Sequence, residues 1–185
     1  MKKNILCVIG KSGSGKSTII DILCKDNNYN YVRSYTTRQI RKDDANDVNT
    51  HIFVTPNDFY EDLINGRIIT SYVSPNRYIN WNTDDLFLEN KINVLAIDPK
   101  AFTEMIDLYG NQYNIYGIYV YLPEDIRKER IEKRGDKYML EPHLSHSELK
   151  WYPAWYDVVD NSSSPEDSID FIKYVIKRKG LKCAD

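Results

Sequence analysis

The chain has 185 residues, of which 42% are hydrophobic and 28% are charged. This balance indicates one folded domain with a sizeable core and excludes a disordered chain. The formal net charge of −2 gives no general attraction to nucleic acid, and no apolar run approaches the ~20 residues that span a membrane. Because Met1 to Asn4 lead directly into an apolar segment, we expect no signal peptide and a cytoplasmic protein.

The first motif is Gly10-Lys11-Ser12-Gly13-Ser14-Gly15-Lys16-Ser17, which fits the phosphate-binding pattern G-x-x-x-x-G-K-[ST]. It lies between a predicted buried strand at 5–9 and a predicted helix at 18–24. In that context the glycines let several N–H groups point at one phosphate, and the helix N-terminus adds its positive dipole end. An ordinary glycine-serine turn is the alternative, which the lysine and the flanking elements disfavour.

This motif predicts the donor half of a phosphoryl-transfer site. Lys16 is expected to hold the β- and γ-phosphates of ATP, and Ser17 to ligate Mg²⁺. The expected ATP-binding residues of the loop are Gly10, Ser12, Gly13, Ser14, Gly15, Lys16, Ser17 and Thr18.

The next region, residues 34–81, is too irregular for the main sheet and is predicted to form an inserted subdomain. Within it, 42–49 has no apolar period and is predicted to be an exposed loop. Strands are expected at 51–54, 68–73 and 77–81, and a helix that begins with Pro56 is expected to end at Asn65-Gly66.

Strands and helices alternate again after residue 81. Strands are predicted at 92–97, 115–122 and 157–159, and helices at 84–89, 99–108, 123–134 and 165–177. This order predicts an α/β fold with a mostly parallel sheet that helices cover on both faces. Cys7, Cys24 and Cys183 show neither metal-ligand nor disulfide spacing.

Two arginines mark a possible acceptor site. Arg38 and Arg41 stand three residues apart beside the hydroxyl residues Ser34, Thr36 and Thr37. The planar fork of arginine binds phosphate oxygens bidentately, whereas two solvated arginines on a surface loop are the alternative. Behind a phosphate-binding loop, we favour a site for the phosphate that receives the phosphoryl group.

At these motifs the sequence resembles the guanylate kinase family, over nearly the whole chain. The family loop corresponds to residues 10–17, and its S-x-T-T-R-x-x-R segment to 34–41. Its F-V-[ST]-x-x-x-F, N-x-Y and R-x-x-x-R-G segments correspond to 53–59, 76–78 and 130–135. The resemblance implies a P-loop core (1–33, 82–134 and 156–185), a monophosphate-binding subdomain (34–81) and a lid (135–155).

The resemblance also implies roles for single residues. Lys16, Arg38, Arg130 and Arg134 are the implied catalytic residues, the last two closing over the transferring phosphoryl group. Arg38, Arg41 and Tyr78 hold the acceptor phosphate, Ser34 touches the acceptor base and Asn161 lies near the donor adenine. Because a monophosphate is already ionised, catalysis requires chiefly positioning and charge stabilisation.

The chain departs from the family pattern where the family reads guanine. Thr70 and Ala96 stand in place of two carboxylates, Asn80 in place of a serine and His51 in place of a tyrosine, whereas Asp98 keeps one acid. Loss of hydrogen-bonding partners for a polar base can lower discrimination by ~10⁴-fold. We therefore expect an acceptor with fewer donors than GMP, such as a plain or modified pyrimidine deoxynucleotide.

The implied lid lacks one further family arginine, and either His143 or Lys150 could replace it. His143 and His146 lack a third neighbouring ligand, so no metal site is expected. An aromatic cluster, Trp151, Tyr152, Trp155 and Tyr156, is expected to pack the lid on the core. The less favoured alternative is a stacking platform for single-stranded nucleic acid.

Three functions stay open at this point. The first is an ATP- and Mg²⁺-dependent kinase that acts on a small-molecule nucleotide, as a monomer or homodimer. The second is a kinase for a sugar phosphate such as ribose 1,5-bisphosphate, or for a modified base in DNA, with Asp98 as base. The third is a non-catalytic binding module, which the retained Lys16 and Ser17 disfavour.

Overall fold

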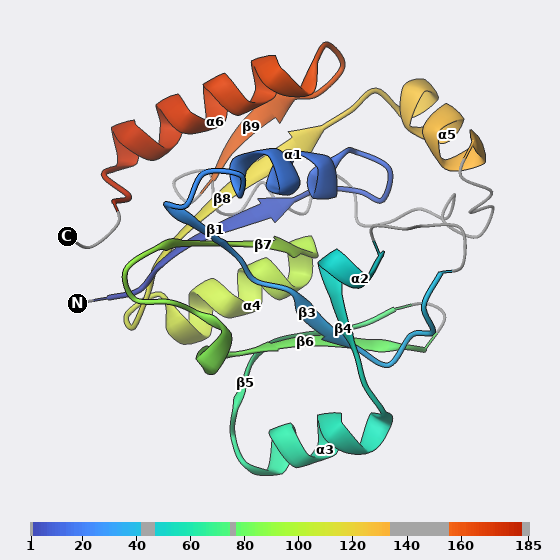
Figure 1. The fold of residues 1–185 in the computed structure, drawn as a ribbon, viewed down its shortest axis with the longest axis vertical. Helices are drawn as coiled ribbons and strands as arrows, with labels where there is room; N and C mark the ends of the chain where they lie inside the picture. The colour runs from blue at the N-terminus through green and yellow to red at the C-terminus, as the bar shows by residue number, and fades with distance from the viewer. Residues whose placement is uncertain (1, 42–46, 75–76, 134–155, 183–185) are drawn as a thin grey trace.

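The computed structural model describes residues 2–41, 47–74, 77–133 and 156–182 (Figure 1). Its larger sheet has five strands in the order β2-β7-β1-β8-β9, all paired in parallel. The strands are β1 (Asn4–Ile9), β2 (Tyr29–Tyr31), β7 (Ile92–Ile97), β8 (Asn114–Tyr121) and β9 (Tyr156–Asp160). The parallel α/β fold that the alternating pattern predicts is therefore confirmed.

Helices cover both faces of this five-stranded sheet. α1 (Lys16–Leu23) and α6 (Pro165–Lys179) lie on one face and α4 (Pro99–Tyr109) lies on the other (Figure 1). Each face has its own apolar core, and β1 between them is buried from Ile5 to Ile9 at 0% exposure. Burial from both sides explains why this strand is an unbroken apolar run in the sequence. α5 (Glu124–Lys133) follows the end of β8.

A second sheet of four strands has the order β4-β3-β6-β5. Its strands are β3 (Ser34–Thr36), β4 (His51–Phe53), β5 (Ile68–Val73) and β6 (Ile79–Thr83). α3 (Pro56–Ile64) covers one face of it (Figure 1). On that face Trp81 stacks on Tyr35 with ring centroids 5.4 Å apart, and its indole N–H donates to Asp62 at 2.7 Å. The other face is therefore left to look toward the five-stranded sheet.

Two sequence expectations are wrong in the described residues. Asp47, expected in an exposed loop, begins the short helix α2 (Asp47–Thr50) and is 1% exposed, because its carboxylate pairs with Arg38. The helix expected at 84–89 is only a 3₁₀ turn, η1 (Asp84–Leu86), because the backbone is extended at Phe87, whose side chain is buried.

Other expectations concern residues outside the described ranges. These include the whole lid at 135–155, with its histidines and Lys150, and also Arg134. None of the helices in the described ranges combines the length and apolar character that a membrane span requires.

Candidate active site

The candidate site lies at the carboxyl end of the five-stranded sheet. β1 and β7 end side by side, because Ile9 pairs with Ile97 in register. The phosphate-binding loop begins at Gly10, directly after β1, and Asp98 directly follows β7. Ligands of open parallel sheets bind outside the carboxyl ends of the strands, so the loop and Asp98 share the edge where a ligand is expected.

Close packing beneath the loop explains two of its glycines. Gly13 and Gly15 have φ angles of 81° and 99°, which side chains rarely adopt. A Cβ at Gly13 would stand 2.9 Å from Cγ1 of Ile131 in α5, and one at Gly15 would collide with the amide nitrogen of Asn161. The loop therefore rests directly on α5 and on the turn after β9, with no room for side chains.

Side-chain donors hold the carbonyl groups of the loop. Lys16 Nζ donates to Gly10 O at 2.8 Å and to Lys11 O at 3.0 Å. Arg127 donates to Ser12 O at 3.1 Å, and Asn161 Nδ2 donates to Ser14 O at 2.8 Å. Four carbonyl oxygens that would repel a phosphate are thus engaged by donors from outside the loop or from its own lysine.

Asn161, which the resemblance places near the donor adenine, lies in the turn after β9. It is 2% exposed, and while its nitrogen donates to Ser14, its Oδ1 accepts from the Ser168 hydroxyl at 3.0 Å. Both ends of the amide are therefore used inside the protein. Asn161 positions the loop rather than offering an open amide to a base.

Arg127 is a residue that the sequence reasoning missed. It is 2% exposed, and its guanidinium binds Glu124 at 3.0 Å and 2.5 Å besides the loop carbonyl. Hydrogen bonds from Arg127 lower the pKa of Glu124 to about 2. The one available signal was the i, i+3 spacing of Glu124 and Arg127, which is common on exposed helices as well.

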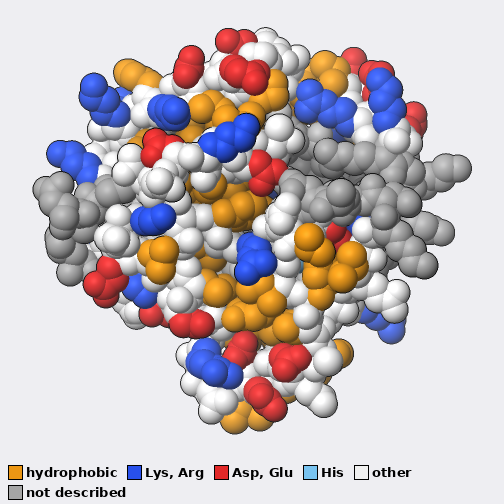
Figure 2. Space-filling model, in the orientation of Figure 1, with side chains coloured by type: hydrophobic (Ala, Val, Ile, Leu, Met, Phe, Trp, Pro, Cys, Tyr) orange, Lys and Arg blue, Asp and Glu red, His pale blue; other side chains and the backbone are white. Residues whose placement is uncertain are grey.

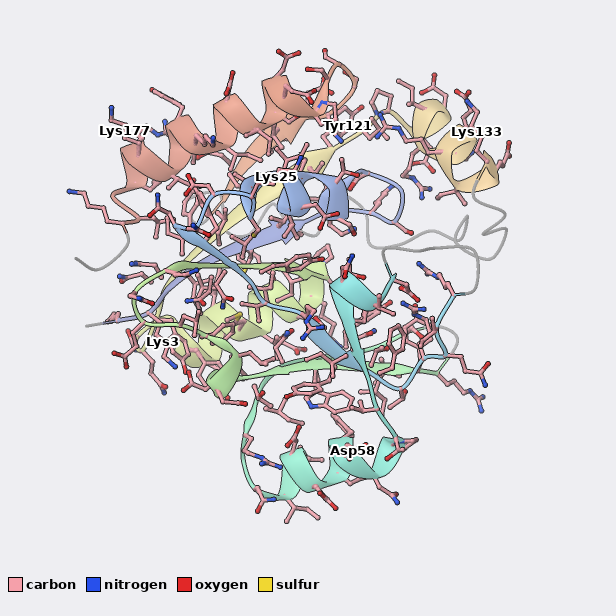
Figure 3. All side chains as sticks on the ribbon, in the orientation of Figure 1. Lys3, Lys25, Asp58, Tyr121, Lys133 and Lys177 are labelled. Atoms are coloured by element: carbon pink, nitrogen blue, oxygen red, sulfur yellow. The ribbon has the colours of Figure 1, made fainter. Side chains whose placement is uncertain are left out.

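The remaining donor residues surround the same loop. Ser17 and Thr18 are exposed in the first turn of α1, and an Arg130 nitrogen lies 3.6 Å from the position of a Cβ on Gly15. Ser14 is 1% exposed, its hydroxyl has no hydrogen-bond partner, and it lines a cavity of about 140 Å³ at the end of β8. Tyr121, labelled in Figure 3, lines the same cavity.

Arg38 of the expected acceptor site is held by a buried carboxylate. Its NH2 and NH1 atoms donate to Oδ1 and Oδ2 of Asp47 at 2.6 Å and 2.8 Å, and NH1 also donates to Gln39 O. Oδ2 of Asp47 accepts from the Arg41 backbone N–H at 2.8 Å. Burial raises the pKa of Asp47, but the Arg38 and Arg41 hydrogen bonds bring it below its usual range.

His51 lies against this pair. Its Nδ1 is 2.8 Å from Thr50 Oγ1, 3.5 Å from Arg38 NH2 and 3.7 Å from Asp47 Oδ1. Burial, and then the positive charge of Arg38, lower the pKa of His51 to about 4. The ring is therefore neutral at pH 7. Phe53 completes the setting, with its ring centroid 5.4 Å from the Arg38 guanidinium carbon.

The free face of the four-stranded sheet is polar. Cross-strand register places Ser34 and Thr36 of β3, Asn80 and Asn82 of β6, and Thr70 and Tyr72 of β5 on that one face. Because α3 covers the opposite face, this polar face is turned toward the five-stranded sheet (Figure 1). Burial, and then the nearby Asp98 carboxylate, raise the pKa of Tyr72. Asn82, Tyr72 and Asp47 are members of the candidate site that the sequence reasoning did not name.

Hydrogen bonds account for part of this face. The Ser34 hydroxyl donates to Asn82 Oδ1 at 3.1 Å, and Asn82 Nδ2 donates to Arg33 O at 3.2 Å. Tyr78 precedes β6, where its N–H donates to the Ser74 hydroxyl. Asp98 Oδ1 accepts from Lys100 N at 2.8 Å and so caps α4. Of the expected acceptor residues, Ser34, Thr70 and Asn80 thus share one sheet face, and Asp98 directly follows β7.

The sequence of the chain is similar to those of known guanylate kinases. Over 98% of its length the chain is 26% identical to the guanylate kinase of Malacoplasma penetrans, covering 96% of that protein, and 26% identical to that of Thermotoga maritima, covering 90%. No protein-family model matches the chain.

The crystal structure of guanylate kinase from Anaplasma phagocytophilum superposes with a TM-score of 0.69 at 20% identity, over 98% of this chain and 89% of that one. This likeness concerns the fold. In sequence over nearly its whole length, and in the parallel α/β fold around a phosphate-binding loop, the chain is similar to guanylate kinases.

Proposed function

We propose that the protein transfers the γ-phosphoryl group of ATP, with Mg²⁺, to the phosphate of a nucleoside monophosphate. The side chains that would contact the base of this acceptor differ from those that contact guanine in guanylate kinases. The observation that carries this proposal is the phosphate-binding loop at the carboxyl end of the five-stranded sheet, where donors hold the carbonyls of Gly10, Lys11, Ser12 and Ser14. The polar face of the four-stranded sheet is turned toward that sheet (Figure 1). The guanylate kinases named above support the reaction class.

The donor residues fit a triphosphate and its metal. Gly13 and Gly15 let the loop pack directly on Ile131 and Asn161, which holds the backbone in a curve that can point its N–H groups at a phosphate. Lys16 can hold the β- and γ-phosphates, and the exposed Ser17 hydroxyl can reach Mg²⁺. When bound, Mg²⁺ supplies positive charge that offsets the transferring phosphoryl group. No group of three His, Cys, Asp or Glu side chains in the described ranges could itself hold a metal.

The protein's own residues would orient and stabilise rather than exchange protons. Arg130, whose guanidinium lies near Gly15, would offset the charge that develops on the γ-phosphoryl group. Arg38 and Arg41 would hold the acceptor phosphate, whose oxygen is ionised at pH 7 and attacks without a general base. Arg38 is presented in one orientation by Asp47, so its donors need little ordering when a phosphate arrives.

The distribution of charge on the surface supports a small-molecule acceptor rather than nucleic acid. On the face shown in Figure 2, Lys and Arg side chains lie scattered among acidic ones and form no continuous basic surface. Nucleic acid binding draws its strength from phosphate contacts by such surfaces. A sugar phosphate is the second candidate, because the described polar face offers hydroxyl and amide groups that suit a sugar as well as a base.

The test is an assay of the purified protein with ATP, Mg²⁺ and each common ribo- and deoxynucleoside monophosphate, with ribose 1,5-bisphosphate as a further arm. We expect ADP and one nucleoside diphosphate in equal amounts, and none with EDTA. Turnover of ribose 1,5-bisphosphate alone would select the sugar phosphate. Absence of turnover and of ATP binding by calorimetry would select a binding module.

A further inference from the structure

A cavity of about 140 Å³ lies at the end of β8, between the phosphate-binding loop and α5. Lys11 and Ser14 of the loop line it, together with Glu124 and Arg127 of α5. Lys16 and Ser17, which are expected to hold the phosphates and Mg²⁺, do not line it. The cavity is therefore separate from the place where ATP is expected to bind.

The cavity is large enough for a small molecule and can be reached from solvent. An engineered protein cavity of about 150 Å³ binds benzene, which has more heavy atoms than phosphate or acetate. The side chains of Lys11 and Glu124, which line the cavity here, are 30% and 45% exposed. A ligand can therefore enter past them.

Buried hydrogen-bonding groups at this cavity are only partly used. Ser14 is 1% exposed, and its hydroxyl has no partner in the part of the chain that the structure describes. Arg127 is 2% exposed, and it spends three of its five N–H groups on Glu124 and Ser12 O. The other two have no acceptor among the described residues. Because unpaired buried donors destabilise a fold, these groups indicate a ligand that carries acceptor atoms.

The charge of the lining residues favours an anion. Lys11 and Arg127 are cationic, whereas Glu124 is the single acidic residue that lines the cavity. Hydrogen bonds from Arg127 lower the pKa of Glu124 to about 2, so it is ionised at pH 7 and leaves a net positive charge. Its carboxylate is already engaged by Arg127 and lies 3.4 Å from Lys11 Nζ. A second, unengaged set of acceptor oxygens is what the remaining donors lack.

We propose that this cavity binds a small oxyanion, a phosphate or a carboxylate, through Ser14, Arg127 and Lys11. Ser14 belongs to the loop, and Arg127 holds the loop carbonyl of Ser12 at 3.1 Å. A bound oxyanion therefore joins the loop to α5 without occupying the ATP site. Any factor by which it changes the affinity for ATP is matched by an equal effect of ATP on its own affinity.

Nuclear magnetic resonance locates the ion. The ¹⁵N-labelled protein, saturated with Mg²⁺ and a non-hydrolysable ATP analogue, is titrated with sodium phosphate, with sodium acetate, and with sodium chloride at matched ionic strength. We expect phosphate, acetate or both to give saturable shifts of the backbone amide signals of residues 121–127, and chloride to give none. The arm that saturates at the lower concentration identifies the preferred oxyanion.

Three results would overturn the inference. The first is no saturable shift at 121–127 with either oxyanion, which means that the cavity holds water only. The second is shifts confined to 10–17 and 38–41, which place the ion at the nucleotide sites. The third is the same shifts with chloride, which mean an adventitious ion only. If the ATP analogue does not bind, the proposed function fails, but the location of the shifts is read in the same way.

Variants separate a ligand role from a structural one. Ser14→Ala removes the unpaired hydroxyl, so we expect an equal or higher Tm without ligand and an affinity for the preferred oxyanion about ten-fold lower. Lys11→Met should lower that affinity less, by about three-fold, because its charge is partly exposed. The control is Lys133→Met, on the exposed side of α5 (Figure 3), which should not change it.

The affinities of these variants also decide against the inference. An unchanged affinity in Ser14→Ala would show that its hydroxyl is only an unpaired group. A loss in Lys133→Met as large as that in Lys11→Met would show general attraction by the charge of α5. Should Ser14→Ala fold poorly, the comparison of Lys11→Met with Lys133→Met decides the outcome.

Discussion

The donor loop and the acceptor face are built in opposite ways. In the loop, protein donors engage the carbonyls of Gly10, Lys11, Ser12 and Ser14, so its shape is fixed before a ligand arrives. On the acceptor face, polar atoms of Thr70 and Asn80 are left without partners. The difference is that the protein itself fixes the shape of the loop, whereas on the acceptor face it leaves polar atoms unsatisfied.

Lys16→Ala should cause the largest loss of activity, through the donor loop. The ammonium group both bridges two loop carbonyls and supplies the charge expected on the β- and γ-phosphates. We expect kcat/KM to fall by about 10³-fold, the size of effect seen when a preorganised charge-stabilising donor is removed. Steady-state kinetics measures this. Lys11→Ala, which loses only a partly exposed contact of 3.4 Å with Glu124, should lower the rate far less.

Asp47→Asn should weaken acceptor binding and leave ATP binding unchanged. Replacing the buried carboxylate leaves Arg38 without its bidentate partner, so we expect a loss of about 3 kcal/mol in unfolding free energy. The KM for the acceptor should rise while the KM for ATP stays unchanged. Urea unfolding and kinetics with each substrate varied separately measure the two effects.

A matched control for Asp47→Asn is Glu129→Gln. Its ion pair with Lys133 lies on the exposed side of α5, where such pairs contribute little. Equal behaviour of the two variants, or an acceptor KM that does not respond to Asp47→Asn, would contradict the positioning of Arg38 by Asp47.

Asn161→Ala should loosen the donor loop by a smaller amount. It removes the buried donor to Ser14 O and leaves the Ser168 hydroxyl without one of its acceptors. We expect a loss of about 1–2 kcal/mol in unfolding free energy and weaker ATP binding by calorimetry. An unchanged affinity for ATP would show that the loop holds its shape without this contact.

His51, on the acceptor side, should make the free energy of unfolding depend on pH. Its pKa is about 4 in the folded protein and 6.5 as the ordinary value, so between these values the unfolded chain binds the extra proton. Stability is therefore lost as pH falls from 7 to 5, by about 1–2 kcal/mol. Urea unfolding at both pH values should show a smaller loss in His51→Asn. Identical losses in both proteins would refute this origin.

The two halves also differed in how far the sequence could predict them. The loop was predictable because its residues are consecutive and flanked by a strand and a helix. Arg127 and Asn161 reach the loop from 115 and 147 residues away, and no local pattern indicates such contacts. Asp47 was placed in an exposed loop because it lies in a polar run, and only its pairing with Arg38 explains its burial.

The acceptor face lay between these cases. Thr70 and Asn80 could be named from their positions, but that their polar atoms are buried and unpartnered depends on the register of β5 and β6 and on packing across the face. The bulge at Ile69, between the register pairs of Ile68 and Thr70, also changes the alternation that sequence reasoning assumes.

Phosphorus NMR of the whole reaction tests the central claim most directly. The purified protein is mixed with ATP, Mg²⁺ and its best monophosphate, and the phosphorus signals are followed with time. We predict that ATP and monophosphate disappear together while ADP and a second nucleoside diphosphate appear in equal amounts, and that Lys16→Ala abolishes the change. Formation of ADP and inorganic phosphate alone, or identical progress in Lys16→Ala, would contradict the account.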